Sequence, residues 1–337
     1  MIIVMKNNAT KQDFDAVEEL ILSQGLKPHL SQGAQASIIG VIGDKTRLSI
    51  ENIEMMSGVD KVVPVMESYK LAGRSFHPED SVIDVSGVKI GGKELVVMAG
   101  PCAVESEEQI MKAAEAVAKA GAKFLRGGAY KPRTSPYAFQ GLEDEGYRLL
   151  RKAGDAFGLK VISEVVSQNE IAIASECCDM IQVGARNMQN FRLLRELGRC
   201  GRPVLLKRGI ASTVVEWLDA AEYILSEGNP NVVLCERGIR TFETATRNTL
   251  DLGAVAVVKE RSHLPIIVDP SHAAGKVRYV EPLALAGIAA GADGLIVEVH
   301  PQPAKALSDA AQQLSPVQFE QMMQRCRAVA QAVGRIL

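Results

Sequence analysis

Residues 95–139, LVVMAGPCAVESEEQIMKAAEAVAKAGAKFLRGGAYKPRTSPYAF, contain one complete strand–helix–strand unit. Residues 95–100 form an apolar run that ends at Gly-Pro, which is typical of a buried parallel strand. Ser106 stands three residues before Gln109, the spacing of a capping box, and apolar residues then recur at helical intervals. Residues 124–127 predict the next strand. A unit of this kind indicates an α/β fold.

The loop after this second strand carries cations on a backbone shaped by glycine and proline. Arg126, Lys131 and Arg133 fall within eight positions, with small hydrogen-bonding residues between them. Such a loop suits the binding of phosphate or carboxylate. The alternative is a solvated surface loop, as for most clusters of Arg and Lys. Because this loop follows the carboxyl end of a buried strand, we favour an anion site.

Length and composition describe an ordinary globular chain. It has 337 residues, 47% of them hydrophobic and 23% charged, which is enough for more than one domain. No apolar run predicts a membrane span and the N-terminus lacks a secretory pattern, so we expect a cytoplasmic protein without a membrane partner. The net charge of −2 argues against nucleic-acid binding. The six cysteines, without a CxxC pair, are expected to be reduced thiols.

From residue 95 onward, strand and helix patterns alternate regularly. Six further apolar runs are predicted to be strands: 160–165, 180–183, 203–207, 232–235, 265–268 and 294–297. With the first two they make eight strands, the number in a (β/α)8 TIM barrel. A doubly wound open sheet is the competing fold, but no GxGxxG motif follows the first strand. We predict a barrel over residues 95–337, with Ser315 and Gln318 as the capping box of its last helix.

The first 70 residues form a unit of their own. Their patterns follow the order β-α-β-β-α-β, the ferredoxin-like arrangement. The expected elements are residues 1–5, 11–24, 27–31, 36–42, 48–56 and 61–66. We therefore predict a small α+β domain at residues 1–70. Residues 71–94 are predicted to be a linker that runs into a β-hairpin capping the barrel.

Charged and metal-binding residue types stand directly after the predicted barrel strands. In a (β/α)8 barrel these positions ring the face at which active sites are built. Random placement would put as many such residues at the opposite strand ends. The sequence therefore predicts one active-site mouth. The residues expected there are Cys102, Arg126, Glu164, Ala185, Arg186, Lys207, Arg237, Asp269, His272 and Glu298.

One chemical subset of the mouth consists of cations. Its members are Arg126, Lys131, Arg133, Arg186, Lys207 and Arg237. Six cations are too many to remain unpaired in one cavity, so they predict substrates with several negative charges, phosphates among them. One or two of the six are expected to pair with Glu164, Glu236 or Glu143 instead.

The second subset consists of Cys102, His272 and Glu298, with Asp309 on the loop after the last strand. Thiolate, imidazole and carboxylate together suit a divalent transition ion better than magnesium or calcium. No local motif such as HExxH supports the site, and a lone Cys or His is usually a core residue. Cys102 and His272 differ because both follow strand ends in turns containing glycine or proline, GPC and DPSH.

Several stretches together closely resemble the 3-deoxy-D-arabino-heptulosonate 7-phosphate (DAHP) synthases, of the short type I beta subgroup. They are GPCAVES, RGGAYKPRTSPYAFQG, VGARNMQN, LLKRG, LCERGIRTFE, DPSHAAG and the final Glu298 and Asp309. The resemblance implies a transferase that condenses phosphoenolpyruvate with erythrose 4-phosphate, giving DAHP and phosphate. This metal-dependent, aldol-like reaction is the first step of the shikimate pathway to chorismate and the aromatic amino acids.

The resemblance also implies roles for individual residues. The implied metal ligands, for Mn2+, Fe2+, Zn2+ or Co2+, are Cys102, His272, Glu298 and Asp309. The residues that would hold phosphoenolpyruvate are Arg126, Lys131, Ala185, Arg186, Lys207 and Arg237. Those that would hold erythrose 4-phosphate are Lys131, Pro132, Arg133 and Thr134. As catalytic residues we predict Lys131 as an acid, Glu164 as the activator of water, and Asp269.

Two other functions stay open. The sister octulosonate 8-phosphate synthases carry an Ala-Asn-Arg type sequence after the lysine, whereas this chain has Pro132-Arg133-Thr134, which favours the four-carbon sugar. A phosphosugar or amino-acid sensor on an inactive barrel is the non-enzymatic alternative. The complete ligand set argues against it, because a sensor has no evident need for a transition metal.

The N-terminal unit resembles the ferredoxin-like regulatory domain that is fused to some members of this family. The resemblance implies allosteric feedback inhibition by tyrosine or phenylalanine. It also implies a homo-oligomer, which we expect to be a tetramer.

Overall fold

The structure is a computed structural model that describes residues 1–32, 37–42, 48–63, 67–131, 135 and 137–337. The chain divides into two compact units, Met1–Ser68 and Tyr69–Leu337. Among the described residues, no helix is both long and apolar enough to cross a membrane.

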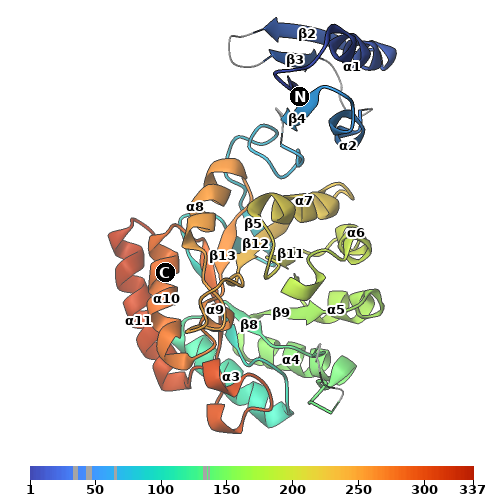
Figure 1. Cartoon of the computed structure of the whole chain (residues 1–337). Coiled ribbons are helices and arrows are strands. Elements are labelled where there is room, and N and C mark those ends of the chain that lie inside the picture. The colour runs from blue at the N-terminus through green and yellow to red at the C-terminus, as the bar shows by residue number, and fades with distance from the viewer. Residues whose placement is uncertain (33–36, 43–47, 64–66, 132–134, 136) are drawn as a thin grey trace. The chain divides into compact units, whose positions relative to one another are not determined.

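The N-terminal unit is a four-stranded antiparallel sheet with two helices (Figure 1). Its elements are β1 Ile2–Met5, α1 Lys11–Ser23, β2 Lys27–Gln32, β3 Ser37–Ile42, α2 Ile50–Glu54 and β4 Val59–Val63. The strand order β2-β3-β1-β4 confirms the predicted ferredoxin-like arrangement. Ile3, Val17, Ile39 and Ile53 are fully buried in its core. The predicted ends of two strands, at residues 36 and 64–66, lie outside the described residues.

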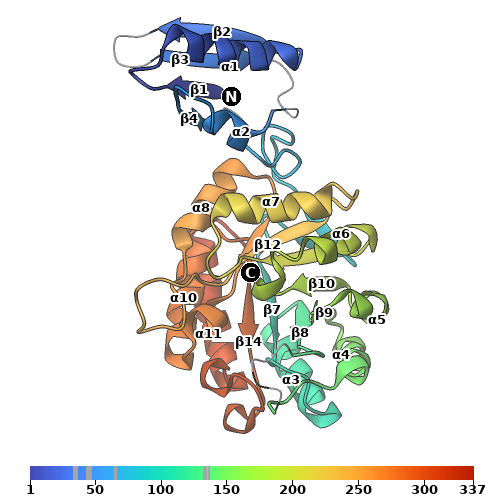
Figure 2. The same cartoon turned by 45° about the vertical axis from the view of Figure 1, so that its right-hand side comes forward.

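The second unit is a closed barrel of parallel strands, as predicted (Figure 2). The strands are β7 Val96–Gly100, β8 Phe124–Arg126, β9 Lys160–Val165, β10 Met180–Val183, β11 Val204–Lys207, β12 Val232–Glu236, β13 Ile266–Val268 and β14 Gly294–Glu298. They follow one another around the barrel in chain order, and β14 pairs with β7. Because the sheet closes on itself, the open-sheet alternative is wrong.

Helices follow the barrel strands and cover the outside of the barrel. They are α3 Glu107–Ala120, α4 Glu143–Phe157, α5 Ile171–Cys177, α6 Phe191–Arg199, α7 Val214–Leu225, α8 Leu252–Arg261, α10 Val277–Ala289 and α11 Pro316–Ala332. A further short helix, α9 Pro270–Ala274, lies between β13 and α10. The start of α11 has the complete capping box expected there.

The capping box predicted for α3 is only half formed. Ser106 accepts a hydrogen bond from the Gln109 backbone, as expected. The Gln109 side chain does not return to Ser106. It accepts from the Glu105 backbone N–H at 3.3 Å and donates to the Ala103 carbonyl at 3.1 Å. The side chain thus holds the segment between β7 and α3 in place.

A hairpin of β5 Ile83–Val85 and β6 Val88–Ile90 closes one end of the barrel. Ile83, Val85 and Ile90 are buried in one cluster with inward-facing side chains from every barrel strand. The Ser86 hydroxyl donates to Asp179, directly before β10, at 2.7 Å. The hairpin therefore lies at the amino ends of the strands and does not cover their carboxyl ends, where a functional site can form.

Candidate active site

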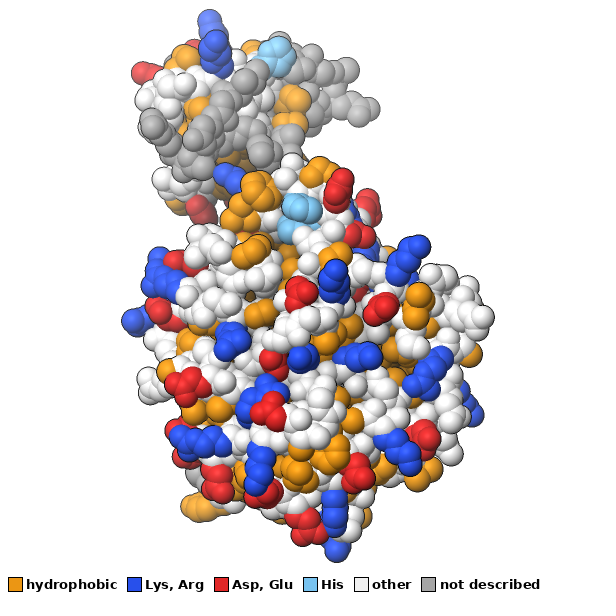
Figure 3. All heavy atoms as spheres, turned by 180° about the vertical axis from the view of Figure 1, so that it is seen from behind, with side chains coloured by type: hydrophobic (Ala, Val, Ile, Leu, Met, Phe, Trp, Pro, Cys, Tyr) orange, Lys and Arg blue, Asp and Glu red, His pale blue; other side chains and the backbone are white. Residues whose placement is uncertain are grey.

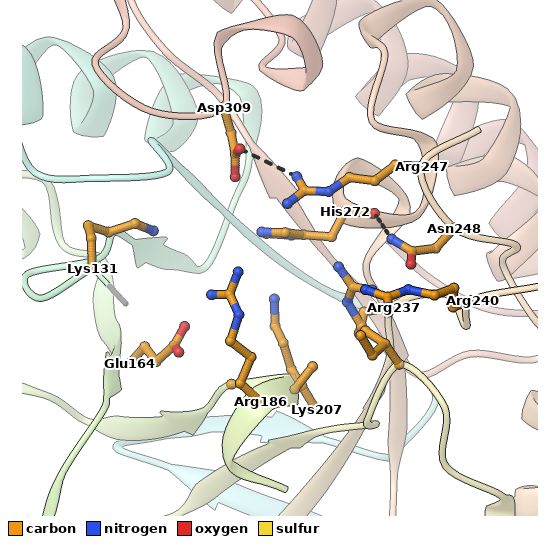
Figure 4. Close-up of a pocket in the computed structure, with 13 residues that line it drawn as sticks. Lys131, Glu164, Arg186, Lys207, Arg237, Arg240, Arg247, Asn248, His272 and Asp309 are labelled. Atoms are coloured by element: carbon orange, nitrogen blue, oxygen red, sulfur yellow. Dashed lines mark hydrogen bonds and ion pairs between the residues drawn. The ribbon is translucent and has the colours of Figure 1, made fainter. Parts of the chain in front are cut away.

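The carboxyl ends of the barrel strands surround a cavity of about 380 Å³ (Figure 4). Its walls come from the strand ends and following loops of β8 through β14. The described residues that line it are Lys131, Glu164, Gly184, Ala185, Arg186, Lys207, Ile210, Arg237, Arg240, Arg247, Asn248, His272 and Asp309. The cavity thus lies at the strand ends where the sequence analysis expects the mouth.

Cations dominate the wall of this cavity. Those among the described lining residues are Lys131, Arg186, Lys207, Arg237, Arg240 and Arg247. In the described part of the chain, only two acidic side chains, Glu164 and Asp309, line it with them. On the face of the molecule seen in Figure 3, side chains of both signs are interspersed. The positive charge of the cavity wall suits ligands with several negative charges.

Two glycines make room for the side chains of the wall. A Cβ atom on Gly184 would lie 2.1 Å from Oε1 of Glu164, so glycine lets this carboxylate keep its position. The other Glu164 oxygen accepts a hydrogen bond from Gln182 at 2.9 Å. A Cβ on Gly128 would likewise meet the Lys131 side chain at 2.8 Å. Because neither glycine has a Cβ, the backbone on these two sides of the cavity leaves room for the Glu164 and Lys131 side chains.

Cys102, Glu298 and Asp309 form a group of possible metal ligands. One donor atom of each lies within 4.8 Å of the other two. Burial and the neighbouring Glu298 carboxylate raise the pKa of the Cys102 thiol to about 12. Lys131 reaches this group with its ammonium, which lies 3.2 Å from Cys102 Sγ. One soft and two hard donors fit a divalent transition ion.

His272, the fourth predicted ligand, lies beside this group. Its Nε2 is 3.4 Å from Oε1 of Glu298, while its Nδ1 bonds to Asp269 at 2.7 Å. A carboxylate on one ring nitrogen orients the other toward a metal, as in many metal sites. Burial lowers the pKa of His272, although Asp269 acts in the opposite direction. A neutral ring with a free Nε2 lone pair suits metal binding.

Asp269 does not line the cavity but lies behind it, 1% exposed. It accepts hydrogen bonds from Lys207 Nζ at 2.5 Å and from the His272 ring. Burial alone would raise the pKa of this carboxyl, but His272, with its two hydrogen bonds, and the nearby Lys207 ammonium hold the pKa well below its usual value. Asp269 therefore stays ionised and fixes two side chains that do face the cavity.

Arg126 is also absent from the cavity wall. It is buried and donates to Glu298 at 3.1 Å and to the Pro101 carbonyl at 2.7 Å. Among the described residues, the predicted cations Arg126 and Lys207 thus pair with carboxylates. Their partners are Glu298 and Asp269, and not the three glutamates expected from the sequence.

Glu236 illustrates why those partners could not be chosen from the sequence. It ends β12 but is fully buried, and it accepts from Arg208 at 2.9 Å. Arg208 follows Lys207 directly, and adjacent residues of a strand point to opposite sides. Lys207 therefore faces the cavity, while Arg208 pairs with Glu236 and Asp251 away from it.

Three polar residues of the cavity were missed, namely Arg240, Arg247 and Asn248. All three lie on the loop between β12 and α8, beyond the positions directly after the strand. Arg247 donates to Asp309 at 3.4 Å, and Asn248 donates to the His272 backbone carbonyl at 3.0 Å. The sequence feature that could have indicated them is the repetition of arginine along this loop. The predicted residues Pro132, Arg133 and Thr134 lie outside the described residues.

A closed (β/α)8 barrel with a cationic cavity beside thiol and carboxylate donors is an arrangement that suits an enzyme for anionic substrates. Residues 75–333 match the model of the DAHP synthetase I family, and residues 1–67 match that of the DAHP synthase ferredoxin-like domain. The chain belongs to the DAHP synthetase I family, which confirms the resemblance found in its motifs. It is accordingly an enzyme of the transferase type.

Relatives of known identity support this assignment. The phospho-2-dehydro-3-deoxyheptonate aldolase of Thermotoga maritima is 49% identical over 334 residues, 99% of each chain. A crystal structure of that aldolase matches the fold of this chain with a TM-score of 0.96. The match covers 99% of this chain and 98% of the chain in the crystal structure. A 2-dehydro-3-deoxyphosphooctonate aldolase of Geobacter sulfurreducens is 31% identical over 73% of this chain and 97% of its own.

Proposed function

We propose that this enzyme condenses phosphoenolpyruvate with erythrose 4-phosphate to give DAHP and phosphate. The observation that carries the proposal is the position of Lys131, which lines the cationic cavity and also contacts Cys102 of the candidate metal group. Two phosphorylated substrates require many cations, and an aldehyde acceptor benefits from a Lewis acid. The relative that is 49% identical over the full length is named for the heptulosonate reaction.

We assign phosphoenolpyruvate to the inner part of the cavity. Its phosphate and carboxylate would be held by Arg186, Lys207 and Arg237, together with the backbone at Ala185. Arg126 would act from behind, and its Nε has no hydrogen-bond partner among the described residues. Erythrose 4-phosphate would be held by Lys131 and by residues 132–134. With this division, C3 of the enol would lie near the aldehyde of the sugar.

We assign a divalent transition metal to Cys102, His272, Glu298 and Asp309. When bound there, such an ion acts as a Lewis acid that polarises or orients the sugar aldehyde. The donor set of one thiol, one imidazole and two carboxylates supports Mn2+, Fe2+, Zn2+ or Co2+ over magnesium or calcium. Asp269 would position His272 and Lys207 and take no part in bond making.

The chain's own groups would move the protons of the reaction. C3 of phosphoenolpyruvate attacks the aldehyde carbon, and Lys131 protonates the oxygen of the new hydroxyl. The attack leaves positive charge at C2, and water adds there and gives a proton to Glu164. The bond between C2 and the phosphate oxygen then breaks and its electron pair leaves with the phosphate. The proton of the new C2 hydroxyl passes to the departing phosphate, so that C2 becomes the keto group. Holding both substrates in register supplies at most about 7–11 kcal/mol of the barrier reduction.

The test follows the loss of phosphoenolpyruvate absorbance. The purified chain receives erythrose 4-phosphate or arabinose 5-phosphate, each before chelation, after chelation and after Mn2+ is restored. Metal-dependent turnover with the four-carbon sugar supports the proposal. Turnover with the five-carbon sugar alone would assign the octulosonate reaction, and no turnover with either would favour the sensor.

We further propose that the reaction supplies the shikimate pathway in the cytoplasm and that residues 1–70 regulate it. The match of residues 1–67 to the ferredoxin-like domain of DAHP synthases supports the second point. Residues 71–94 would serve as linker and hairpin cap, and residues 95–337 as the catalytic barrel. Turnover is expected to fall on addition of tyrosine or phenylalanine. Light scattering is expected to give a tetramer, and a monomer would refute that assignment.

A further inference from the structure

Two consecutive glutamines lie directly behind the candidate metal group. Gln312 ends a short turn, η5 Ala310–Gln312, that follows Asp309, and Gln313 comes directly after this turn. Their side chains are almost fully buried, with 2% and 1% of the residue exposed. Neither residue lines the cavity or takes part in the proposed reaction. Buried amides of this kind must find specific partners.

Gln312 connects Glu298 to the cavity wall. Its Nε2 donates to Oε2 of Glu298 at 2.7 Å, and its Oε1 accepts from Arg247 at 3.0 Å. An arginine can only donate and a carboxylate can only accept, so these two partners fix which end of the amide points where. The Glu298 carboxylate is thereby held in one orientation.

Gln313 connects the two chain segments that carry Cys102 and Asp309 of the candidate metal group. Its Oε1 accepts from the Cys102 backbone N–H at 3.1 Å, and its Nε2 donates to the Ser308 carbonyl at 2.7 Å. The N–H and the C=O again fix the direction of the amide. The two contacts tie the loop that carries Cys102 to the turn that carries Asp309.

Contacts on both sides fix the turn at Asp309. Asp309 has a φ of +49°, a left-handed conformation that few residues other than glycine, asparagine and aspartate adopt. The preceding peptide is held by Gln313, and the Ser308 hydroxyl lies 3.1 Å from Cys102 Sγ. The neighbouring structure therefore holds Asp309 in its unusual conformation and aims it at the thiol.

We propose that Gln312 and Gln313 are positioning residues that preorganise Cys102, Glu298 and Asp309 for a transition metal. The inference rests on the proposed metal site and extends it. Each donor comes from a different segment, after β7, at the end of β14 and in the following loop, and the adjacent glutamines contact all three segments. Groups that orient metal ligands are typically worth roughly 10- to 100-fold in metal affinity.

The test uses Gln312→Met and Gln313→Met in the full chain. Methionine keeps the length of the side chain, but it cannot donate a hydrogen bond and its sulfur is only a weak acceptor. Gln312→Met leaves Glu298 and Arg247 without this partner, and Gln313→Met does the same for the Cys102 N–H and the Ser308 carbonyl. The matched control is Gln324→Met, on the exposed side of α11.

The measurement is Co2+ binding, in competition with a chelator, at a temperature where circular dichroism shows each variant folded. The absorption band of a thiolate bound to Co2+ reports on Cys102 directly and requires no turnover. Each glutamine variant is expected to bind Co2+ roughly 10- to 100-fold more weakly and to shift or weaken this band. Gln324→Met is expected to match the parent chain in both respects.

The outcomes separate this inference from the proposed function. If the parent binds Co2+ through its thiolate but both variants stay within twofold of it, the positioning role is wrong and the metal site stands. If the parent shows no thiolate band, the metal site fails, and the positioning role fails with it. Should one variant not fold, the other decides alone, because the two break contacts with different ligands.

Discussion

Lys131 joins the two chemical parts of the site within one side chain. Its ammonium lies 3.0 Å from the Cys102 carbonyl and 3.2 Å from the thiol, and the side chain also faces the cavity. A cation at this point can bind a substrate anion and can also deliver a proton. Mutation should separate these roles from metal binding.

We predict that Lys131→Met lowers kcat by roughly 10²- to 10⁴-fold, the usual contribution of a general acid. Metal binding should persist, because the four proposed ligands remain. The measurement is steady-state turnover together with Co2+ binding. Lys112→Met, on the exposed surface of α3, serves as control and should leave kcat unchanged. Near-normal turnover of Lys131→Met would rule out the acid role.

Gly184 provides a second prediction at the level of one residue. Gly184→Ala would place a methyl carbon 2.1 Å from Oε1 of Glu164, so the carboxylate must move. If Glu164 activates water, kcat should fall by roughly 10²-fold or more, as in Glu164→Gln. The control is Gly92→Ala, where an added Cβ has no neighbour within 4 Å. A Gly184→Ala enzyme as fast as the parent would show that the position of Glu164 is unimportant.

At the level of elements, the strands could be predicted from the sequence and their side-chain partners could not. Buried parallel strands consist of nearly continuous apolar residues, so each predicted strand lies within two residues of the observed one. The position of a residue after a strand likewise identifies the face on which it lies. Which carboxylate pairs with which cation depends on packing between distant segments. Arg126 and Glu298, for example, are 172 positions apart.

The loop between β12 and α8 contributes cations that do not stand directly after a strand, and these were therefore not predicted from the sequence. Arg240 is exposed at the cavity, and a phosphate there would gain a charged hydrogen bond. We predict that Arg240→Met raises KM for one phosphorylated substrate by roughly 10- to 150-fold, because such bonds are worth roughly 1.5–3 kcal/mol, while kcat changes little. Arg192→Met, on the exposed side of α6, is the control. Unchanged KM values for both substrates would place Arg240 outside the binding site.

The segment after residue 68 is bound to the ends of α7 and α8. The Leu71 carbonyl accepts from His263 Nε2 at 2.7 Å, and the Ser81 hydroxyl lies 2.7 Å from His263 Nδ1. Burial lowers the pKa of His263, although the bond to Leu71 opposes this. The folded state therefore binds a proton less readily than the unfolded chain, whose histidine has a pKa near 6.5.

This contact predicts a pH dependence of stability. The contribution of neutral His263 is fully present above pH ~6.5 and is lost as the pH falls below that value, because the unfolded state then binds more protons. His263→Asn lacks this linkage. The difference in unfolding midpoint between the parent and His263→Asn should therefore shift in favour of the variant from pH 7.5 to 5.5. A constant difference across that range would contradict the prediction.

For the whole molecule, the proposed metal would connect the first and last strands of the barrel. Cys102 and Asp309 are 207 positions apart, and both follow strands that pair with each other to close the sheet. A ligand that binds only the folded state stabilises it by about 2.7 kcal/mol at 100 times its Kd. For a barrel of this size we expect Mn2+ or Co2+ to raise the unfolding midpoint by roughly 5–10 °C, and chelation to reverse the shift.

Calorimetry with and without chelator tests this expectation, and substitution of the Cys102 thiol shows whether the proposed site binds the ion. In Cys102→Ser the metal-dependent shift should largely disappear, since a hydroxyl is a far poorer ligand for these ions than a thiolate. In Cys200→Ser, a half-buried cysteine on the outside of the barrel, the shift should remain. The N-terminal unit is compact on its own and can unfold in a separate transition, so the comparison applies to the barrel transition. A midpoint that is the same with and without metal, or a shift that survives Cys102→Ser, would mean that the four proposed residues do not hold the ion.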